Sequence, residues 1–235
     1  MSGELKDRRA GEPGAAGARA QDARSLETRE KLLAGALRTL VEQGITKASA
    51  RAIAATAGVN QALVFYHFGS VDELLAAACR YGAEQRVARH RERLRSVTSL
   101  TELLAFGREL HEEERAAGHV AFLGQLLAGA QAHPRLVPAT AAGLDLWIAE
   151  IEQVLVRVLA GTPLAEFTDP AGLARAVGAS FVGLELYEGV DPAGAEAAFA
   201  ALEQLGALMA AVEELNPVAR KAVTYTLRRQ SSRIR

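Results

Sequence analysis

The chain contains few residue arrangements that would support catalysis or metal binding. The run from His111 to Arg115 approaches the H-E-x-x-H pattern of a zinc protease, but arginine stands where the second histidine is required. The other histidines are scattered, and neither a P-loop nor a G-x-G-x-x-G segment occurs. Cys79 is the only cysteine and is expected to be a small core residue, with redox sensing as the alternative. The sequence therefore predicts a protein that is not an enzyme and that uses no cofactor or metal.

The composition predicts an all-α protein. Of the 235 residues, 49% are hydrophobic but only 5% are aromatic, and long β-branched runs are missing. No window of about 18 apolar residues is free of charge, and the N-terminus lacks the pattern of a signal peptide. We therefore expect a cytoplasmic protein that does not enter a membrane.

The charges are segregated along the chain, although the formal net charge is only -1. Residues 25–95 carry a net charge of +4, residues 96–215 one of -12, and residues 216–235 one of +6. This distribution favours contact between the N-terminal region and a polyanion, with ordinary solvated helix faces as the alternative.

Four regions follow from the apolar periodicity and the breaks in it. Residues 1–24 show no apolar period and are expected to form a flexible arm. Residues 25–75 hold three short helices, and residues 76–215 hold longer ones that form the body of the protein. Residues 216–235 form a basic tail that begins near a proline.

The three short helices are bounded by recognisable caps. The first is expected to begin after Ser25 or Thr28. The second follows Ser49 and stops at Gly58, and the third begins after Asn60 and runs to about residue 67. This spacing is typical of a helix-turn-helix, although two packed helices can adopt it without binding DNA.

The longer helices of the body also have local start signals. Ser70 with Glu73 and Ser99 with Glu102 form capping boxes. An acidic residue followed by proline opens two further helices, at Asp169-Pro170 and Asp191-Pro192. The helix that begins at the first box is expected to reach about Arg95 and to connect the short helices to the body.

A specific resemblance lies within residues 28–75. The residues that carry it are Gly44, Ser49, Ile53, Ala54, Ala57, Gly58, Val59, Asn60, Tyr66, His67, Phe68, Leu74 and Leu75. This pattern resembles the N-terminal domain of the TetR family of transcriptional regulators. The resemblance implies a homodimer whose third helix enters the major groove of double-stranded operator DNA. It also implies a C-terminal pocket for a small molecule, whose binding controls the distance between the two DNA-binding domains of the dimer.

The resemblance also implies which residues face DNA. They are Ser49, Ala50, Arg51, Asn60, Gln61, Ala62, Leu63, Val64, Phe65, Tyr66 and His67. Asn60 and Gln61 are suited to adenine edges, and Tyr66 to phosphate oxygens. Two residues depart from the family pattern, because Phe65 replaces a common tyrosine and Val71 a common lysine. Each departure removes a phosphate donor.

The acidic body is expected to bind the small molecule and to form the dimer. The candidate pocket residues are His119, Phe122, Gln125, Trp147, Phe181, Glu185 and Tyr187, any of which can instead belong to the core. The carboxylates and apolar helices favour a lipophilic and cationic ligand. The helices after Pro170 and Pro192 carry small and apolar residues that would pair in a four-helix bundle between two chains.

The sequence therefore predicts an all-α, ligand-responsive, DNA-binding transcriptional regulator. Its three-helix DNA-binding domain is joined by a long helix to a ligand-binding and dimerisation domain. Repression from a palindromic operator, with release by a small molecule, is the expected mode of action. The alternative is a helical homodimer that binds a small molecule or a protein partner without specific DNA binding.

Overall fold

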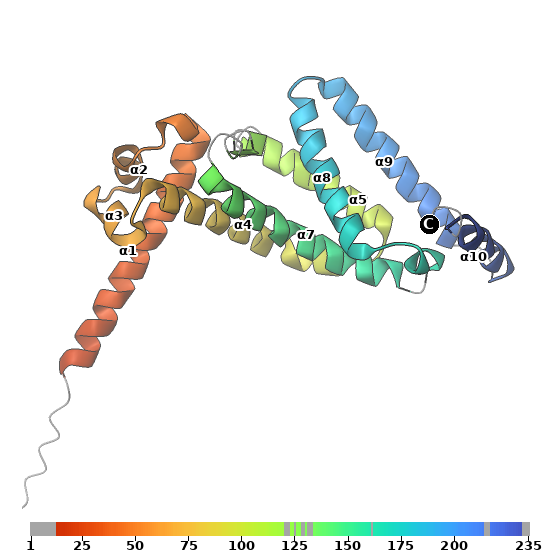
Figure 1. Cartoon of the computed structure of the whole chain (residues 1–235), viewed down its shortest axis with the longest axis horizontal. Helices are drawn as coiled ribbons and strands as arrows, with labels where there is room; N and C mark the ends of the chain where they lie inside the picture. The colour runs from red at the N-terminus through yellow and green to blue at the C-terminus, as the bar shows by residue number, and fades with distance from the viewer. Residues whose placement is uncertain are drawn as a thin grey trace, which may run out of the picture.

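The computed structural model describes residues 13–119, 123–124, 126–127, 130, 134–160, 162–213 and 217–231. Every regular element within these residues is helical, which confirms the all-α fold (Figure 1). The stretch between Gly118 and Pro134 is described only in part. Two of the candidate pocket residues, Phe122 and Gln125, lie outside the described residues.

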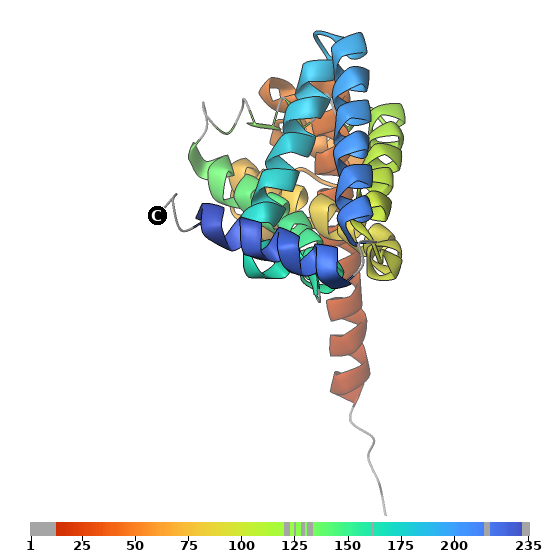
Figure 2. The ribbon, with the colours of Figure 1, turned by 90° about the vertical axis from the view of Figure 1, so that its right-hand side faces the viewer.

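The helices form two parts that are joined by one long helix. At one end lie α1 (Pro13–Gln43), the 3₁₀ turn η1 (Ile45–Lys47), α2 (Ala50–Ala57) and α3 (Ala62–Phe68). From this end α4 (Val71–Ser96) runs into the second part, as Figure 1 shows. The second part contains α5 (Leu100–Ala116), η2 (Pro134–Leu136), α7 (Val137–Leu159), η3 (Pro163–Glu166), α8 (Pro170–Glu188), α9 (Pro192–Glu213) and α10 (Pro217–Ser231). Helices α8 and α9 pack side by side in Figure 2.

The first helix begins earlier than its apolar pattern indicates. It starts at Pro13 rather than after Ser25 or Thr28, and residues 17–24 are exposed on turns that project away from the molecule (Figures 1 and 2). Proline suits a first helical turn, and the alanines that follow have high helix propensity. A helix that buries no face shows no apolar period, so periodicity alone misses it. The predicted arm is thus helical from Pro13, and its flexibility stays a prediction.

The other predicted helix starts are confirmed by their caps. The hydroxyl of Ser49 accepts a hydrogen bond from the backbone N–H of Ala52, at 3.2 Å. The hydroxyls of Ser70 and Ser99 likewise cap α4 and α5, each accepting from the N–H three residues later. At the start of α8, the carboxylate of Asp169 accepts from two backbone N–H groups. Each cap involves residues that are close in sequence, so the sequence alone predicts where these helices begin.

The first part has its own apolar core, built from the inward faces of four helices. The side chains of Leu32, Ala36, Leu40, Ile53, Ala54, Val64, Leu74 and Ala78 are buried in it. Helices α1 and α2 approach so closely that a Cβ atom placed on Gly35 would lie 2.7 Å from the Cβ atom of Ala57. Leu126, Ala130 and Leu136 belong to the same cluster, so the core also joins the two parts.

Helix α4 is held to the second part by ion pairs and by a cap at its C-terminal end. The guanidinium of Arg157 donates a hydrogen bond of 2.9 Å to the carbonyl oxygen of Leu94, in the last turn of α4. The guanidinium of Arg91 pairs with the nearly buried carboxylate of Glu150 on α7, at 2.8 Å. Arginines of α4 therefore tie it to its neighbours, since Arg93 also pairs with Glu109 on α5.

Among the residues that the structure describes, no single helix is both long and apolar enough to span a membrane. Helices α3 and α4 together pass the same test of length and composition, but they are bent by 70° at their junction.

Candidate DNA-binding surface and regulatory site

The second and third helices are joined by a tight turn that exposes one face of α3. Gly58 ends α2 in the left-handed region, at a φ of 68°, and the N–H of Val59 bonds back to the carbonyl oxygen of Ala54. The side chain of Asn60 accepts a hydrogen bond of 2.8 Å from the N–H of Ala62, which caps the start of α3. The turn therefore fixes the direction in which α3 leaves the core.

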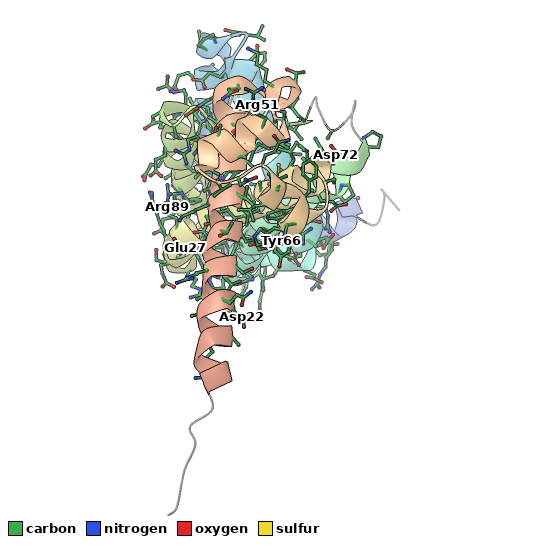
Figure 3. The ribbon with its side chains drawn as sticks, turned by 90° about the vertical axis from the view of Figure 1, so that its left-hand side faces the viewer. Asp22, Glu27, Arg51, Tyr66, Asp72 and Arg89 are labelled. Atoms are coloured by element: carbon green, nitrogen blue, oxygen red, sulfur yellow. The ribbon has the colours of Figure 1, made fainter. Side chains whose placement is uncertain are left out.

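Polar and aromatic side chains gather on the outer face of α2 and α3. Ser49, Arg51, Asn60, Gln61, Ala62, Phe65 and Tyr66 are exposed. Tyr66 is 79% exposed and shares the face seen in Figure 3 with Arg51. The structure thus brings together on one surface most of the residues that the sequence assigned to DNA contact.

The structure corrects two members of that set. Val64 is fully buried in the core of the first part, and Ala50 is buried beneath the first turn of α2. Their side chains cannot reach a base or a phosphate, because each faces the opposite side of its helix from the exposed residues. Leu63 and His67 are half-buried and stand at the edge of the surface.

One residue of α1 that the sequence analysis did not assign to DNA contact lies against the end of α3. The guanidinium of Arg29 donates to the carbonyl oxygen of His67, at 3.2 Å, and lies 4.4 Å from the ring centre of Phe68. A cation at a helix C-terminus meets the negative end of the helix dipole. Arg29 therefore fastens the end of α3 to α1, a contact between residues far apart in sequence that no local pattern signals.

The two departures from the expected phosphate donors differ in their surroundings. Phe65 is about half exposed on the outer face of α3, where it offers no hydrogen-bond donor. Val71 is half-buried and packs against the core of the first part. Val71 therefore has a packing role in this structure.

The candidate pocket residues are divided between two sides of α8. Trp147 on α7 lies near His90, with ring centres 5.9 Å apart, and Phe181 on α8 faces His111 on α5. Glu185 is also turned inward and is only 2% exposed. Tyr187, by contrast, is exposed on the outer side of α8, where its hydroxyl donates to Asp191. The structure therefore separates Tyr187 from the inward-facing candidates.

A cluster of ionisable side chains lies between α5 and α8, and we call it the α5/α8 polar cluster. Its members are Arg86 of α4, His111, Glu114 and Arg115 of α5, His119, and Glu185 and Glu188 of α8. The Nε2 atom of His111 lies 3.0 Å from the carboxylate of Glu188. Glu114 lies 3.1 Å from His119 and 3.7 Å from Arg86. The sequence analysis missed His111 and Glu114, because their partners lie on other elements or beyond a helix break.

Two atoms in this cluster are buried without a hydrogen-bond partner. They are Nδ1 of His111 and Oε1 of Glu185, which lie 3.9 Å apart. Burial, together with the negative charges of Glu114 and Glu188, raises the pKa of the Glu185 carboxyl to about 7, against the opposing effect of Arg86. Glu185 is thus an acid poised between its neutral and charged forms near neutral pH.

Cys79 lies in the core of the first part, as the sequence analysis expected of a small core residue. Burial raises the pKa of its thiol to about 11. The reactive thiolate is scarce at neutral pH for this reason, which argues against redox sensing.

An open apolar groove of about 540 Å³ lies between α8 and α9 on the outer side of the body. Its lining consists of Ser180, Gly183, Leu184, Tyr187, Ala198, Ala201, Leu202 and Leu205. Leu205 is 58% exposed, and Leu208 one turn later is exposed as well. An exposed apolar surface on two adjacent helices is typical of a protein interface.

Within the described residues, no three His, Cys, Asp or Glu side chains are arranged as a metal site.

The fold defines a class of protein, the helix-turn-helix DNA-binding proteins with a second, helical domain. Its features are the exposed face of α2 and α3, the long α4 and the helical body.

Comparison with known proteins specifies the family. Residues 32–78 match the family model of bacterial regulatory proteins of the tetR family. The structure resembles that of SCO7518 from Streptomyces coelicolor A3(2), assigned as a transcriptional regulator, with 25% identity and a TM-score of 0.61. This alignment covers 77% of the present chain and 98% of SCO7518. A search of curated proteins finds no match.

Two further structures are similar. A protein from Rhodococcus sp. assigned to the TetR family is 24% identical, with a TM-score of 0.63 over 76% of this chain and 96% of its own. The multidrug binding protein EbrR, solved with proflavin, is 27% identical, with a TM-score of 0.54 over 76% of this chain and 99% of its own. Residues 32–78 therefore form a DNA-binding domain of the tetR family type, and the described chain shares its fold with structures assigned as transcriptional regulators.

Proposed function

We propose that this chain acts as a homodimeric repressor that binds a palindromic operator and leaves it when a small molecule binds the body. The observation that carries the proposal is the exposed face of α2 and α3 at one end of α4, whose other end is clamped to α7 by Arg157. Because α4 is held at both ends, a change in the packing of the body would move the reading helix.

The reading surface offers three kinds of contact with DNA. The side-chain amide of Gln61 is exposed at the start of α3 and is suited to a bidentate contact with adenine. Arg51 can reach a base or a phosphate, and Tyr66 and His67 can donate to phosphate oxygens. Ser49, Asn60 and Ala62 complete the surface, with Leu63 and Phe65 as apolar contacts.

The groove between α8 and α9 is the proposed dimer interface. Two copies of this apolar surface would bury each other in a four-helix bundle and set the distance between the two DNA-binding domains. A small molecule is proposed to bind among the inward-facing residues of the body, including Trp147, Phe181 and Glu185. The similarity to EbrR, a multidrug binding protein solved with proflavin, supports a small-molecule effector.

The operator is expected to be a palindrome, and selection of bound duplexes from random DNA tests this. Two reading helices related by two-fold symmetry on one face of B-DNA lie about 34 to 36 Å apart, or a multiple of that distance. The selected sites should therefore show inverted half-sites with this spacing. A single asymmetric site bound by one chain would contradict the dimer, and no selection at all would favour a module that binds a ligand or protein instead.

Replacement of Gln61 by alanine is expected to reduce sequence discrimination. Loss of a good base contact costs about 1 to 3 kcal/mol on the operator and nothing on random DNA, where electrostatic contacts dominate. Titration of both duplexes with Gln61→Ala and the unaltered protein measures the difference. The matched control is Gln43→Ala, an exposed glutamine at the end of α1. Equal losses on operator and random DNA would assign Gln61 to the backbone instead.

A further inference from the structure

We propose that the effector is a protonated amine whose ammonium group donates hydrogen bonds to Oε1 of Glu185 and Nδ1 of His111. This inference rests on the proposed function and names the chemical class of its ligand. Both atoms are buried without a partner, and they lie 3.9 Å apart.

Both atoms are acceptors when the imidazole of His111 carries its proton on Nε2. Nε2 of His111 lies 3.0 Å from the carboxylate of Glu188, which can only accept a hydrogen bond when it is charged. In a neutral imidazole, donation from Nε2 leaves Nδ1 with a lone pair. An unpaired carboxylate oxygen and an unpaired ring nitrogen therefore face each other, and each requires a donor from outside the described chain.

The spacing of the two acceptors suits one nitrogen with at least two N–H groups. A nitrogen that donates two hydrogen bonds of about 2.9 Å holds its acceptors roughly 4 to 5 Å apart. The observed 3.9 Å is slightly shorter than this range. A quaternary ammonium has no N–H group to donate, and a neutral alcohol has only one O–H, so neither satisfies both atoms.

The charges around Glu185 also favour a cation. Glu114, Glu185 and Glu188 are opposed by Arg86 and Arg115, so one negative charge in the α5/α8 polar cluster lacks a permanent cationic partner when all three carboxyls are ionised. The remaining members of the cluster are His111 and His119, and His90 lies close enough to feel the charge of Glu114. A buried carboxylate without a counter-ion is costly, and an ammonium would neutralise it.

Aromatic rings beside His111 offer a surface against which the carbon skeleton of the amine can pack. The ring of Phe199 lies 4.8 Å from that of His111, and the ring of Phe181 lies 6.3 Å away. Aromatic faces attract cations and pack against apolar groups. The effector is therefore expected to carry an apolar or aromatic group next to its nitrogen.

Binding of the amine should release a proton near neutral pH. The pKa of free Glu185 is raised to about 7, and the bound ammonium requires the ionised carboxylate. Affinity should therefore rise about tenfold from roughly pH 6 to roughly pH 8, because the neutral fraction of Glu185 falls.

Calorimetry on the full-length protein without DNA tests the proposal with three matched ligands. Phenethylamine carries the ammonium, phenethyltrimethylammonium keeps the charge without an N–H, and 2-phenylethanol removes the charge. We expect phenethylamine to bind at least tenfold more tightly than the other two. Equal or tighter binding of either comparison ligand would overturn the proposal. Butylamine and tryptamine extend the size range, and failure of all three amines to bind would overturn it as well.

Two variants locate the binding. Glu185→Gln keeps the size of the side chain but removes its charge, so it should abolish the preference for the amine and the pH dependence. Glu92→Gln removes a carboxylate from an exposed part of α4, where Glu92 pairs with Arg95, and should bind like the unaltered protein. Amine binding that persists unchanged in Glu185→Gln would place the ligand elsewhere and overturn the proposal.

A separate DNA titration distinguishes the two proposals. A protein that binds its operator but no amine would retain the proposed function and lose this ligand class. A protein that binds the amine through Glu185 without selecting any DNA would retain the amine site and lose the proposed function.

Discussion

Leu205→Glu is expected to convert the proposed dimer to monomers. Leu205 is 58% exposed in this chain and lines the apolar groove between α8 and α9. Two-fold symmetry places the new carboxylate in the interface twice, and each charge is buried without a partner. A total cost of about 4 kcal/mol would raise the dimer dissociation constant roughly 1,000-fold. Light scattering at micromolar concentration measures the mass directly.

The affinity of the Leu205→Glu variant for the operator should also fall, because the variant no longer forms a dimer. A monomer binds only one half-site. In a dimer, the second DNA-binding domain is held at a high effective concentration near the second half-site, and a monomer loses this advantage. The matched control is Val156→Glu, since Val156 is a similarly exposed apolar residue on α7 outside the groove lining. An unchanged dimer mass for Leu205→Glu would show that the two chains meet through another surface.

Gly35→Ala is expected to damage the DNA-binding domain and leave the body intact. The added Cβ atom would lie 2.7 Å from the Cβ atom of Ala57 and 3.0 Å from its Cα atom, so α2 would have to move away from α1. Overpacking of this kind costs about 1 to 3 kcal/mol, which outweighs the gain in helix propensity of up to about 1 kcal/mol. We expect a lower melting temperature for this domain and weaker operator binding, because α3 is connected to the displaced α2.

Gly17→Ala provides the matched control on the same helix. No atom lies within 4 Å of a Cβ atom built there, so the gain in helix propensity should appear without a clash. Thermal melting and operator titration of both variants separate propensity from packing. Similar melting and similar DNA binding for the two variants would contradict the close approach of α1 and α2. Dimer mass should be unchanged in both, because α8 and α9 lie in the body.

The proposed coupling between the two parts depends on how firmly α4 is held. Its N-terminal turns share the core of the first part through Leu74 and Ala78, and its last turn is capped by Arg157 from α7. Arg86 near its middle also contacts the α5/α8 polar cluster through Glu114. A ligand that neutralises Glu185 would change the charge balance around Arg86, and α4 would carry that change towards α3.

The sequence by itself determined the features that depend on neighbouring residues. Ser49, Ser70 and Asp169 begin helices in the structure as predicted, because a cap is a contact between groups two or three residues apart. Gly58 marks the turn before α3 because few other residues adopt its backbone conformation. The candidate DNA-facing residues came from the resemblance to the TetR family, and most of them are exposed on one surface, whereas Ala50 and Val64 are buried.

Only the tertiary structure decided which side chains meet across helices. The contact of Arg29 with His67, the inward direction of Glu185 and the outward direction of Tyr187 depend on how each helix is rotated against its neighbours. The unpartnered pair of Glu185 and His111 arises in the same way, from residues on α8 and α5. Helix rotation is fixed by the sum of many apolar contacts in the core, whereas a cap or a turn is fixed by a few adjacent residues. Local patterns therefore predicted where the helices begin and end, and packing determined which atoms their side chains face.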